Sequence, residues 1–170
     1  MVDTYVGRIA SCFAFGGKAY RLEFVYDRVV LAPITTVWAV LTDPDAMEPH
    51  LPKTTKVVPT EDGDYRVSMK VSLGFLRPTV RAKLRLSNVV EQASFTIGLS
   101  GKSMGAGVNG EAKMLMSESP EKSGATHIVM TGRVETSGLL NKFSDTKIES
   151  AARDFLETYL SNVEQSVQAV

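Results

Sequence analysis

The stretch VWAVLTDPDAMEPHLP, residues 37–52, has the pattern of a short apolar helix followed at once by a second, even shorter helix. Apolar residues at helical spacing begin just before it: Ile34, Val37, Trp38 and Leu41. Pro44 disfavours helical backbone at Asp43, so the first helix ends there, and Asp43 can cap a second helix that has Pro44 in its first turn. Further prolines stop the second helix within a few residues. We therefore predict a broken helical segment between two strands.

Alternating apolar and polar residues predict strands on both sides of this segment. The run Tyr20–Leu31 precedes it, and several similar runs lie between residues 54 and 135. Alternation of this kind is typical of an antiparallel sheet with one face in water. The inward positions on these strands include Tyr26, Met69, Phe95, Met114 and Met130.

The last segment, Leu139–Val170, has the period of a long amphipathic helix. Its apolar face consists of Ile148, Ala152, Phe155, Tyr159 and Val163. No other predicted element is long enough to cover the apolar face of the sheet. The fold class is therefore α+β: a curved antiparallel sheet wrapped around a long C-terminal helix, with two short helices after the first core strand.

The length of 170 residues suits one domain, which we assign to residues 20–170. Residues 1–19 form an N-terminal extension in which Val6–Phe15 could add a strand through a turn at Gly16-Gly17. Nineteen basic residues balance nineteen acidic ones, which gives no general attraction to nucleic acid or to anionic membranes. A single cysteine, Cys12, is consistent with a reducing compartment, so we expect a cytoplasmic protein.

Several motifs suggest sites at first sight, but their context points elsewhere. Residues 105–110 spell GxGxxG, yet the alternating run 111–116 follows where a nucleotide-binding turn needs a helix. The two histidines, His50 and His127, lack the spacing of a zinc site with each other or with Cys12. The acidic pairs lie at predicted caps and turns. We therefore expect no metal, no cofactor and no catalytic constellation.

Basic side chains gather on one face of a single predicted strand, at Arg81, Lys83 and Arg85. Such a face is either simply solvated or a docking surface for anionic lipid or an acidic partner. Nucleic acid is not an expected partner, because no aromatic residues alternate with these charges.

The order of the elements resembles the helix-grip fold of the START and birch-pollen-allergen superfamily. Short motifs also resemble the opening of the CoxG family, which is named for the G subunit of carbon monoxide dehydrogenase: Ala32-Pro33, Val37-Trp38, Leu41-Thr42-Asp43-Pro44 and Leu51-Pro52. Later glycines fall in the family's order, at Gly105, Gly110 and Gly138-Leu139. The chain departs from the family at Lys53, where members often have glycine.

The resemblance implies a carrier rather than a catalyst. Members of the family accompany molybdenum-containing carbon monoxide dehydrogenases or related redox enzymes, and they are implicated in membrane recruitment and in handling quinones. It therefore implies a non-enzymatic binding protein for a quinone-like or lipid-like molecule. A molybdenum hydroxylase would be its partner, and peripheral contact with the inner face of the cell membrane would fit this role.

Inward-facing side chains are the candidates for lining a ligand cavity. They are Tyr26, Trp38, Met69, Phe95, Met114, Met130, Phe155 and Tyr159. The sequence does not separate ligand contacts from plain core among them. We expect the short helix Pro44–Glu48 and the loop Gly101–Gly107 to face each other as a gate to this cavity.

Two alternatives to a carrier stay open. An enzyme of the aromatase or cyclase kind uses the same fold, but it needs polar groups aimed into the cavity, and the predicted inward faces offer few. These few are chiefly the hydroxyls of Tyr26, Tyr65 and Tyr159. The other alternative is an interaction domain whose core is filled, with no cavity at all.

Overall fold

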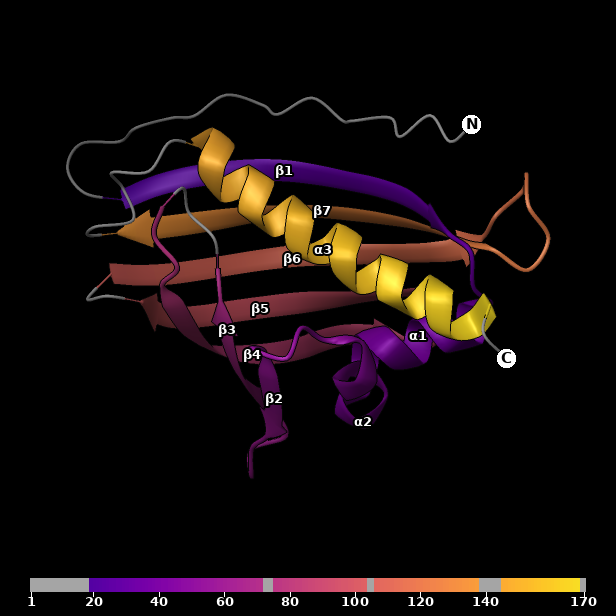
Figure 1. Cartoon of the computed structure of the whole chain (residues 1–170), viewed down its shortest axis with the longest axis horizontal. Helices are drawn as coiled ribbons and strands as arrows, with labels where there is room; N and C mark the ends of the chain where they lie inside the picture. The colour runs from indigo at the N-terminus through magenta and orange to yellow at the C-terminus, as the bar shows by residue number, and fades with distance from the viewer. Residues whose placement is uncertain (1–18, 72–74, 104–105, 138–144, 169–170) are drawn as a thin grey trace.

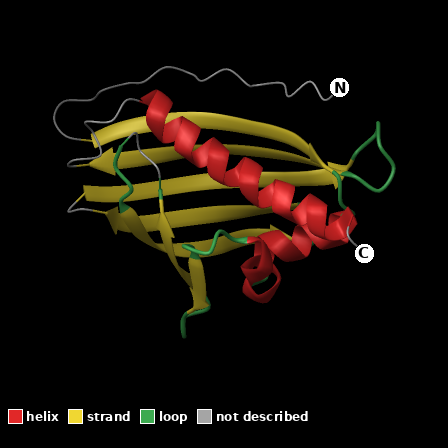
Figure 2. Ribbon diagram, viewed as in Figure 1, coloured by secondary structure: helices red, strands yellow, loops and turns green. Residues whose placement is uncertain are grey.

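A computed structural model describes residues 19–71, 75–103, 106–137 and 145–168 of the chain. The first half contains β1 (Ala19–Val30), α1 (Ile34–Thr42), α2 (Pro44–Met47), the 3-10 helix η1 (Glu48–His50), β2 (Lys56–Pro59) and β3 (Tyr65–Lys70). The second half contains β4 (Thr79–Val90), β5 (Ser94–Ser103), β6 (Ala106–Glu118), β7 (Thr126–Ser137) and α3 (Asp145–Gln168). This is the α+β arrangement of a curved antiparallel sheet with one long C-terminal helix, as predicted (Figure 1, Figure 2).

The seven strands form one sheet in the order β1-β7-β6-β5-β4-β3-β2, and all neighbours are antiparallel. From β2 to β7, each strand pairs with the next one in sequence. The exception is β1, which pairs with β7 along its whole length, from Ala19 opposite Ser137 to Val30 opposite Thr126. The first and last strands are therefore neighbours, and α3 returns from β7 across the sheet.

The apolar core lies at one end of the sheet, where α1 and the C-terminal half of α3 meet the strands. Its buried members are Tyr26, Val30, Ala32, Val37, Val40, Phe95, Met114, Met116, Ile128, Met130, Tyr159, Leu160 and Val163. A second, smaller cluster forms around the buried Val108 near the other end, beneath Ile148 and Ala151 of α3. Of the predicted helical stripe, Ile148, Tyr159 and Val163 lie in these clusters, whereas Ala152 is exposed and Ala151 takes the inward position instead.

The broken helical segment has the predicted shape. Asp43 ends α1, and its carboxylate accepts a hydrogen bond from the backbone N–H of Asp45 at 3.0 Å, with Pro44 in the first turn of α2. Two side chains of α3 then hold the segment in place: the Tyr159 hydroxyl donates to the backbone oxygen of Val40, and Asn162 donates to that of His50 at 2.9 Å. The segment is thus a cap at one end of the sheet.

The predicted gate is wrong in one half. Phe95 packs in the cluster that contains α1, whereas Gly101 lies six residues further along β5. At about 3.3 Å per residue this is about 20 Å, so Gly101 of β5 and Gly107 of β6 lie at the opposite end of the sheet from α2, and residues 104–105 of the predicted loop lie outside the described residues. Alternation assigns a face to each residue, but it does not say which hairpins share an end. The predicted strand Val6–Phe15 lies outside the described residues.

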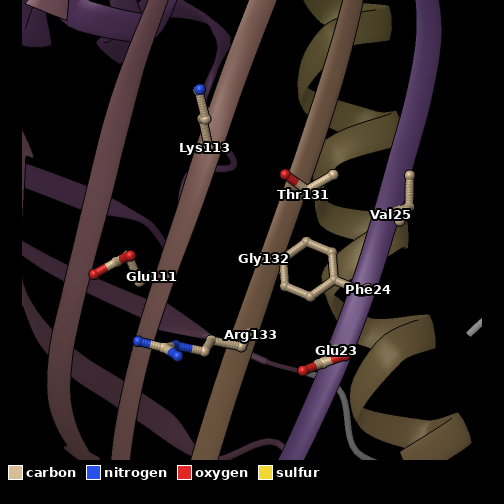
Figure 3. A pocket seen from close by; sticks show the side chains of 8 residues that line it. All are labelled: Glu23, Phe24, Val25, Glu111, Lys113, Thr131, Gly132 and Arg133. Atoms are coloured by element: carbon tan, nitrogen blue, oxygen red, sulfur yellow. The ribbon is translucent and has the colours of Figure 1, made fainter. Parts of the chain in front are cut away.

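Gly132 on β7 has no room for a side chain. It lies between Phe24 and Ala112 on the inner face, and an added Cβ would be 2.8 Å from the Phe24 ring and 2.9 Å from the Ala112 methyl. Figure 3 shows the Phe24 ring beside the Gly132 backbone. By contrast, a Cβ added at Gly98 on β5 would meet only a backbone oxygen at an ordinary 3.8 Å.

We expect Gly132→Ala to lower the free energy of unfolding by about 1–3 kcal/mol, because the new methyl forces Phe24 or Ala112 to move. Gly98→Ala is the matched control, and it should keep or raise stability because alanine restricts the unfolded chain more than glycine does. Urea denaturation of the two variants measures the difference. Equal stabilities would show that Phe24 does not occupy the space above Gly132.

Candidate functional site

The inner face of the sheet is buried at the α1 end and half-buried further along β4 and β5. One row across the strands, Phe95, Met114, Met130 and Tyr26, is buried. The next two rows contain Leu86 opposite Ile97 and Leu84 opposite Leu99. These four side chains, which we call the apolar lining, point the same way but stay half-buried. An apolar surface inside the fold is therefore partly open to solvent.

Two features of the chain leave the apolar lining uncovered. First, α3 crosses the sheet diagonally, from the side of β1 and β7 at its start towards α1 at its end, so β3 and β4 lie to one side of it (Figure 1). Second, the residues next to the lining on β6 are small, Gly110 and Ala112. On β7 the Phe24 ring lies over Gly132 and Val134 lies beside Gly110, so the space there is occupied and the half-buried apolar surface is that of β4 and β5.

Aromatic rings bound the apolar lining at the α1 end. Trp38 meets the buried Phe95 edge-on, with ring centroids 5.6 Å apart. Phe155 stacks on Tyr159 at 6.3 Å, and His50 lies edge-on to Tyr159 at 6.5 Å. Trp38, Phe155 and His50 are half-buried, so each has ring surface that the protein does not cover. Rings of this kind can contact a flat or apolar ligand.

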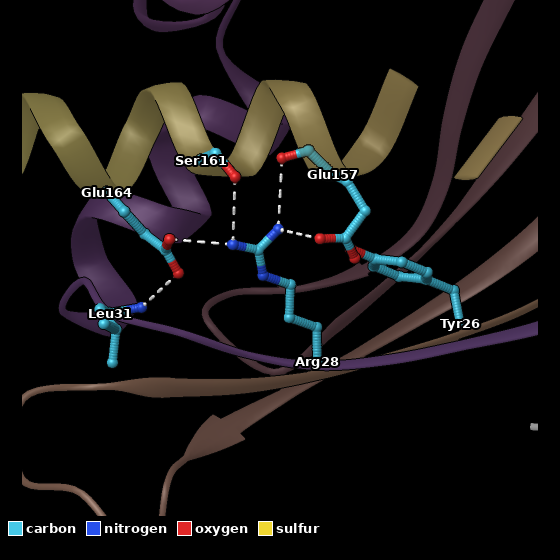
Figure 4. A network of polar contacts seen from close by, with 6 residues as sticks. All are labelled: Tyr26, Arg28, Leu31, Glu157, Ser161 and Glu164. Carbon is cyan, nitrogen blue, oxygen red and sulfur yellow. Dashed lines mark hydrogen bonds and ion pairs between the residues drawn. The ribbon is translucent and has the colours of Figure 1, made fainter. Parts of the chain in front are cut away.

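A polar network fixes α3 beside these rings (Figure 4). Arg28 points inward from β1 and pairs with Glu157 and with Glu164 on α3, each at 2.9 Å. The Tyr26 hydroxyl donates to the other oxygen of Glu157 at 2.5 Å, and Glu164 also accepts from the backbone N–H of Leu31 at 2.9 Å. These contacts join the edge strand to two points of the helix that are about two turns apart.

The charges in the network determine how its groups can act chemically. Burial, reinforced by the hydrogen bond to Glu157, raises the pKa of Tyr26. Burial alone would lower the pKa of Arg28, but its hydrogen bond with Tyr26 and the nearby carboxylates raise it overall. Burial also raises the pKa of Tyr159. Both tyrosines therefore stay protonated at neutral pH with their hydroxyls already donating, which makes them poor groups for proton transfer.

The structure divides the eight predicted ligand residues into three groups. Five are buried in the main core: Tyr26, Phe95, Met114, Met130 and Tyr159. Trp38 and Phe155 are half-buried and pack against the buried rings of Phe95 and Tyr159. Met69 is half-buried opposite Val80, near the other end of the sheet, and does not join the rest.

The apolar lining and the Arg28 network did not emerge as candidates from the sequence. The lining residues show clear alternation, but alternation gives no measure of how well a helix covers each row. Arg28 breaks the apolar alternation of β1 at an inward position, and Glu157 and Glu164 lie seven residues apart on one side of α3. A charge at an inward strand position and two acids at helical spacing are the signal that could have found the network.

A hollow with a volume of about 440 Å³ lies on the face of the sheet opposite to the apolar lining (Figure 3). Its outward side chains come from β1, β6 and β7: Glu23, Val25, Glu111, Lys113, Thr131 and Arg133. These side chains are exposed and mostly charged. The outer hollow is thus open and polar, and its chemistry differs from that of the apolar lining.

Metal and membrane-spanning features are absent from the part of the chain that the structure describes. There, no three His, Cys, Asp or Glu side chains come together as a metal site. His127 contacts Asp27 at 2.7 Å on the outer face, and His50 packs against Tyr159. None of the described helices is long and apolar enough to cross a membrane.

Comparison with known proteins gives a family. The sequence profile of CoxG, the G subunit of carbon monoxide dehydrogenase, matches residues 28–168, from the network residue Arg28 to the end of α3. The chain belongs to this family. No curated protein matches this CoxG-family chain.

Solved structures share its fold at low sequence identity. A conserved protein from Geobacillus kaustophilus has a TM-score of 0.72 at 11% identity, covering 89% of this chain and 95% of its own. A protein from Rhizobium leguminosarum has a TM-score of 0.64 at 17% identity, with 89% and 97% covered. The Zhui aromatase/cyclase from Streptomyces sp. R1128 has a TM-score of 0.59 at 15% identity, with 87% and 94% covered. These likenesses support the helix-grip fold of this CoxG-family protein.

The two phenylalanines nearest the site should differ in their contribution to stability. Phe95 is 1% exposed, so Phe95→Ala should cost about 3–5 kcal/mol of unfolding free energy. Phe155 is half-buried, so Phe155→Ala should cost only about 1–2 kcal/mol, because less apolar surface is returned to water. Thermal and urea unfolding compare the pair. A loss at Phe155 as large as that at Phe95 would mean that Phe155 is packed core and not the border of an open site.

Proposed function

We propose that this CoxG-family protein is a non-enzymatic carrier that binds a hydrophobic small molecule, quinone-like or lipid-like, between α3 and the inner face of β4 and β5. The observation that carries the proposal is the half-buried apolar lining, Leu84, Leu86, Ile97 and Leu99, inside the fold. In a filled core these inward side chains would be buried, as Phe95 is in the adjacent row.

The apolar lining and the aromatic rings suit two parts of one ligand. The lining offers aliphatic contact without polar groups, which favours a hydrocarbon tail. The rings of Trp38 and Phe155 at its α1 end favour a flat head group. Each CH₂ of a tail removed from water contributes about 0.8 kcal/mol, which is about a fourfold gain in affinity. Tail length should therefore control binding.

Family membership supports a role beside a redox enzyme. The family is named for a component of carbon monoxide dehydrogenase, so the proposed partner is a molybdenum hydroxylase of that kind. A carrier of an apolar molecule would work on the cytoplasmic side of the cell membrane, in peripheral contact with its inner face. It would take the ligand from the membrane or return it there.

An aromatase/cyclase-like enzyme is the second candidate, because the Zhui aromatase/cyclase shares the fold. Such chemistry needs free polar groups that can move protons on the substrate. The inward hydroxyls of Tyr26 and Tyr159 are instead engaged with Glu157 and with the backbone of Val40. This arrangement favours the carrier over the enzyme.

Quinones of increasing tail length, titrated by calorimetry, test the carrier. We expect affinity to rise about fourfold per CH₂ until the site is full. Ile97→Trp should fill the site, weakening binding of a long-tailed quinone at least about tenfold while leaving the free energy of unfolding within about 0.5 kcal/mol of wild type. The quinone should be recovered unchanged by mass spectrometry.

Leu115→Trp is the matched control, since Leu115 is 46% exposed on the outer face and the same substitution there should not affect binding. Binding that ignores tail length would contradict the carrier. A loss of about 1–3 kcal/mol in Ile97→Trp without any quinone binding in wild type would indicate a filled core and an interaction domain. A chemically altered product would favour the cyclase-like enzyme.

A further inference from the structure

Phe75 is the most exposed large apolar side chain among the described residues. It is 93% exposed, whereas the next, Val90, is 56% exposed. It lies in the connection between β3 and β4, which is closed by a hydrogen bond from the Val71 N–H to the Pro78 oxygen at 3.0 Å. No other described residue covers this ring, so its apolar surface faces solvent and is available for contact with another surface.

Basic side chains surround the base of the same hairpin. Lys70 and Arg77 flank it in sequence, and Arg81 follows on β4. Arg81 lies directly opposite Lys102 of β5, although like charges opposite each other destabilise a sheet. All four are exposed, and none forms an ion pair with another described residue. An anion outside the molecule would relieve this repulsion.

The structure changes which cations of the predicted basic patch are available. Arg85 donates to both oxygens of Asp64, at 3.0 and 2.9 Å, and Lys83 lies 3.1 Å from the same carboxylate. These two partners lower the pKa of Asp64 to about 2, so its negative charge is always present near neutral pH. Lys83 also lies 3.5 Å from Asp62, so two carboxylates balance Lys83 and Arg85, and the unpaired cations are those nearer the hairpin.

The hairpin also lies beside the start of α3. Val71 packs in the small cluster with Val108 of β6 and with Ile148 and Ala151 of α3, and Leu99 of the apolar lining belongs to the same cluster. The base of the hairpin and one end of the lining are thus in contact through apolar side chains. A surface that received Phe75 would meet the molecule next to its partly open interior.

We propose that the surface formed by Phe75, Lys70, Arg77, Arg81 and Lys102 docks on an anionic phospholipid bilayer, with Phe75 entering the interface and the four cations facing the headgroups. An exposed aromatic ring flanked by unpaired cations suits this surface, because the ring leaves water while the charges attract the lipid phosphates. The inference rests on the proposed function in one respect: an apolar ligand would pass between the bilayer and the lining at this end.

Co-sedimentation with phosphatidylcholine vesicles, with and without phosphatidylglycerol, tests the docking. The wild-type protein should bind only the anionic vesicles, and salt should weaken the binding as the Debye length falls from about 10 Å at 0.1 M to about 3 Å at 1 M. The double variant Lys70→Gln/Arg77→Gln should lose about 30-fold in affinity, or about fivefold per charge. Phe75→Ala should lose about tenfold.

Two matched controls lie on turns at the opposite end of the sheet. Lys122→Gln removes an exposed cation from the β6–β7 turn, and Val90→Ala removes an exposed apolar side chain at the end of β4. Both should bind vesicles as wild type does. Melting temperatures of all the variants should stay close to that of wild type, because every substituted side chain is exposed.

The docking would be overturned if wild type did not bind anionic vesicles, or if the hairpin variants bound them as well as the controls do. If no variant and not even wild type bound vesicles, but the hairpin variants lost binding to an acidic partner protein, the surface would belong to that partner instead. A short-tailed quinone in solution separates the two proposals, because Phe75→Ala should leave its affinity unchanged. Quinone binding without vesicle binding would leave the carrier standing and remove only the docking.

Discussion

The charge cluster of Arg28 with Glu157 and Glu164 determines how α3 lies on the sheet. Arg28 projects inward from an edge strand, and the two carboxylates lie about two turns apart on the helix, so the cluster fixes both the position and the direction of the helix. The Arg28 side chain is only 14% exposed and that of Glu164 only 15%. Charges so little exposed are costly unless they are paired, so a helix that crossed the sheet at another angle would leave these charges buried without partners. We infer that the cluster specifies geometry more than it adds stability.

The site follows from that geometry together with a gradient of side-chain size along the inner face. Near α1, large residues such as Phe95, Met114 and Met130 fill the space beneath the helix. Further along, Gly110 and Ala112 occupy the corresponding positions on β6, and the helix there lies over β1 and β7, away from β4. The half-buried leucines and isoleucine of the apolar lining are the result. In the proposed function this lining is the surface that would contact the ligand.

Much of the fold could be predicted from the sequence, because alternation, helical periodicity and the Asp43-Pro44 cap are local signals. The candidate site was harder to predict. Tyr26 and Trp38 were both assigned inward, yet only the packing of α3 shows that one is buried and the other half-buried. Met69 was also assigned inward and does face inward, but it lies opposite Val80 in a row far from the other candidates, which alternation alone does not show. Periodicity assigns a residue to a face of the sheet. How far that residue is covered depends on the angle at which α3 crosses, which is fixed by contacts between residues more than 100 positions apart in the sequence.

The apolar lining and the outer hollow lie on opposite faces of the sheet, and one measurement decides which of them binds the quinone. Nuclear Overhauser effects from a bound quinone with a short aliphatic tail would identify the methyl groups that it touches. The account predicts contacts from the tail to the methyls of Leu86, Ile97 and Leu99 on the inner face. Contacts to Val25 in the outer hollow, or to Leu115 on the same outer face, would contradict it.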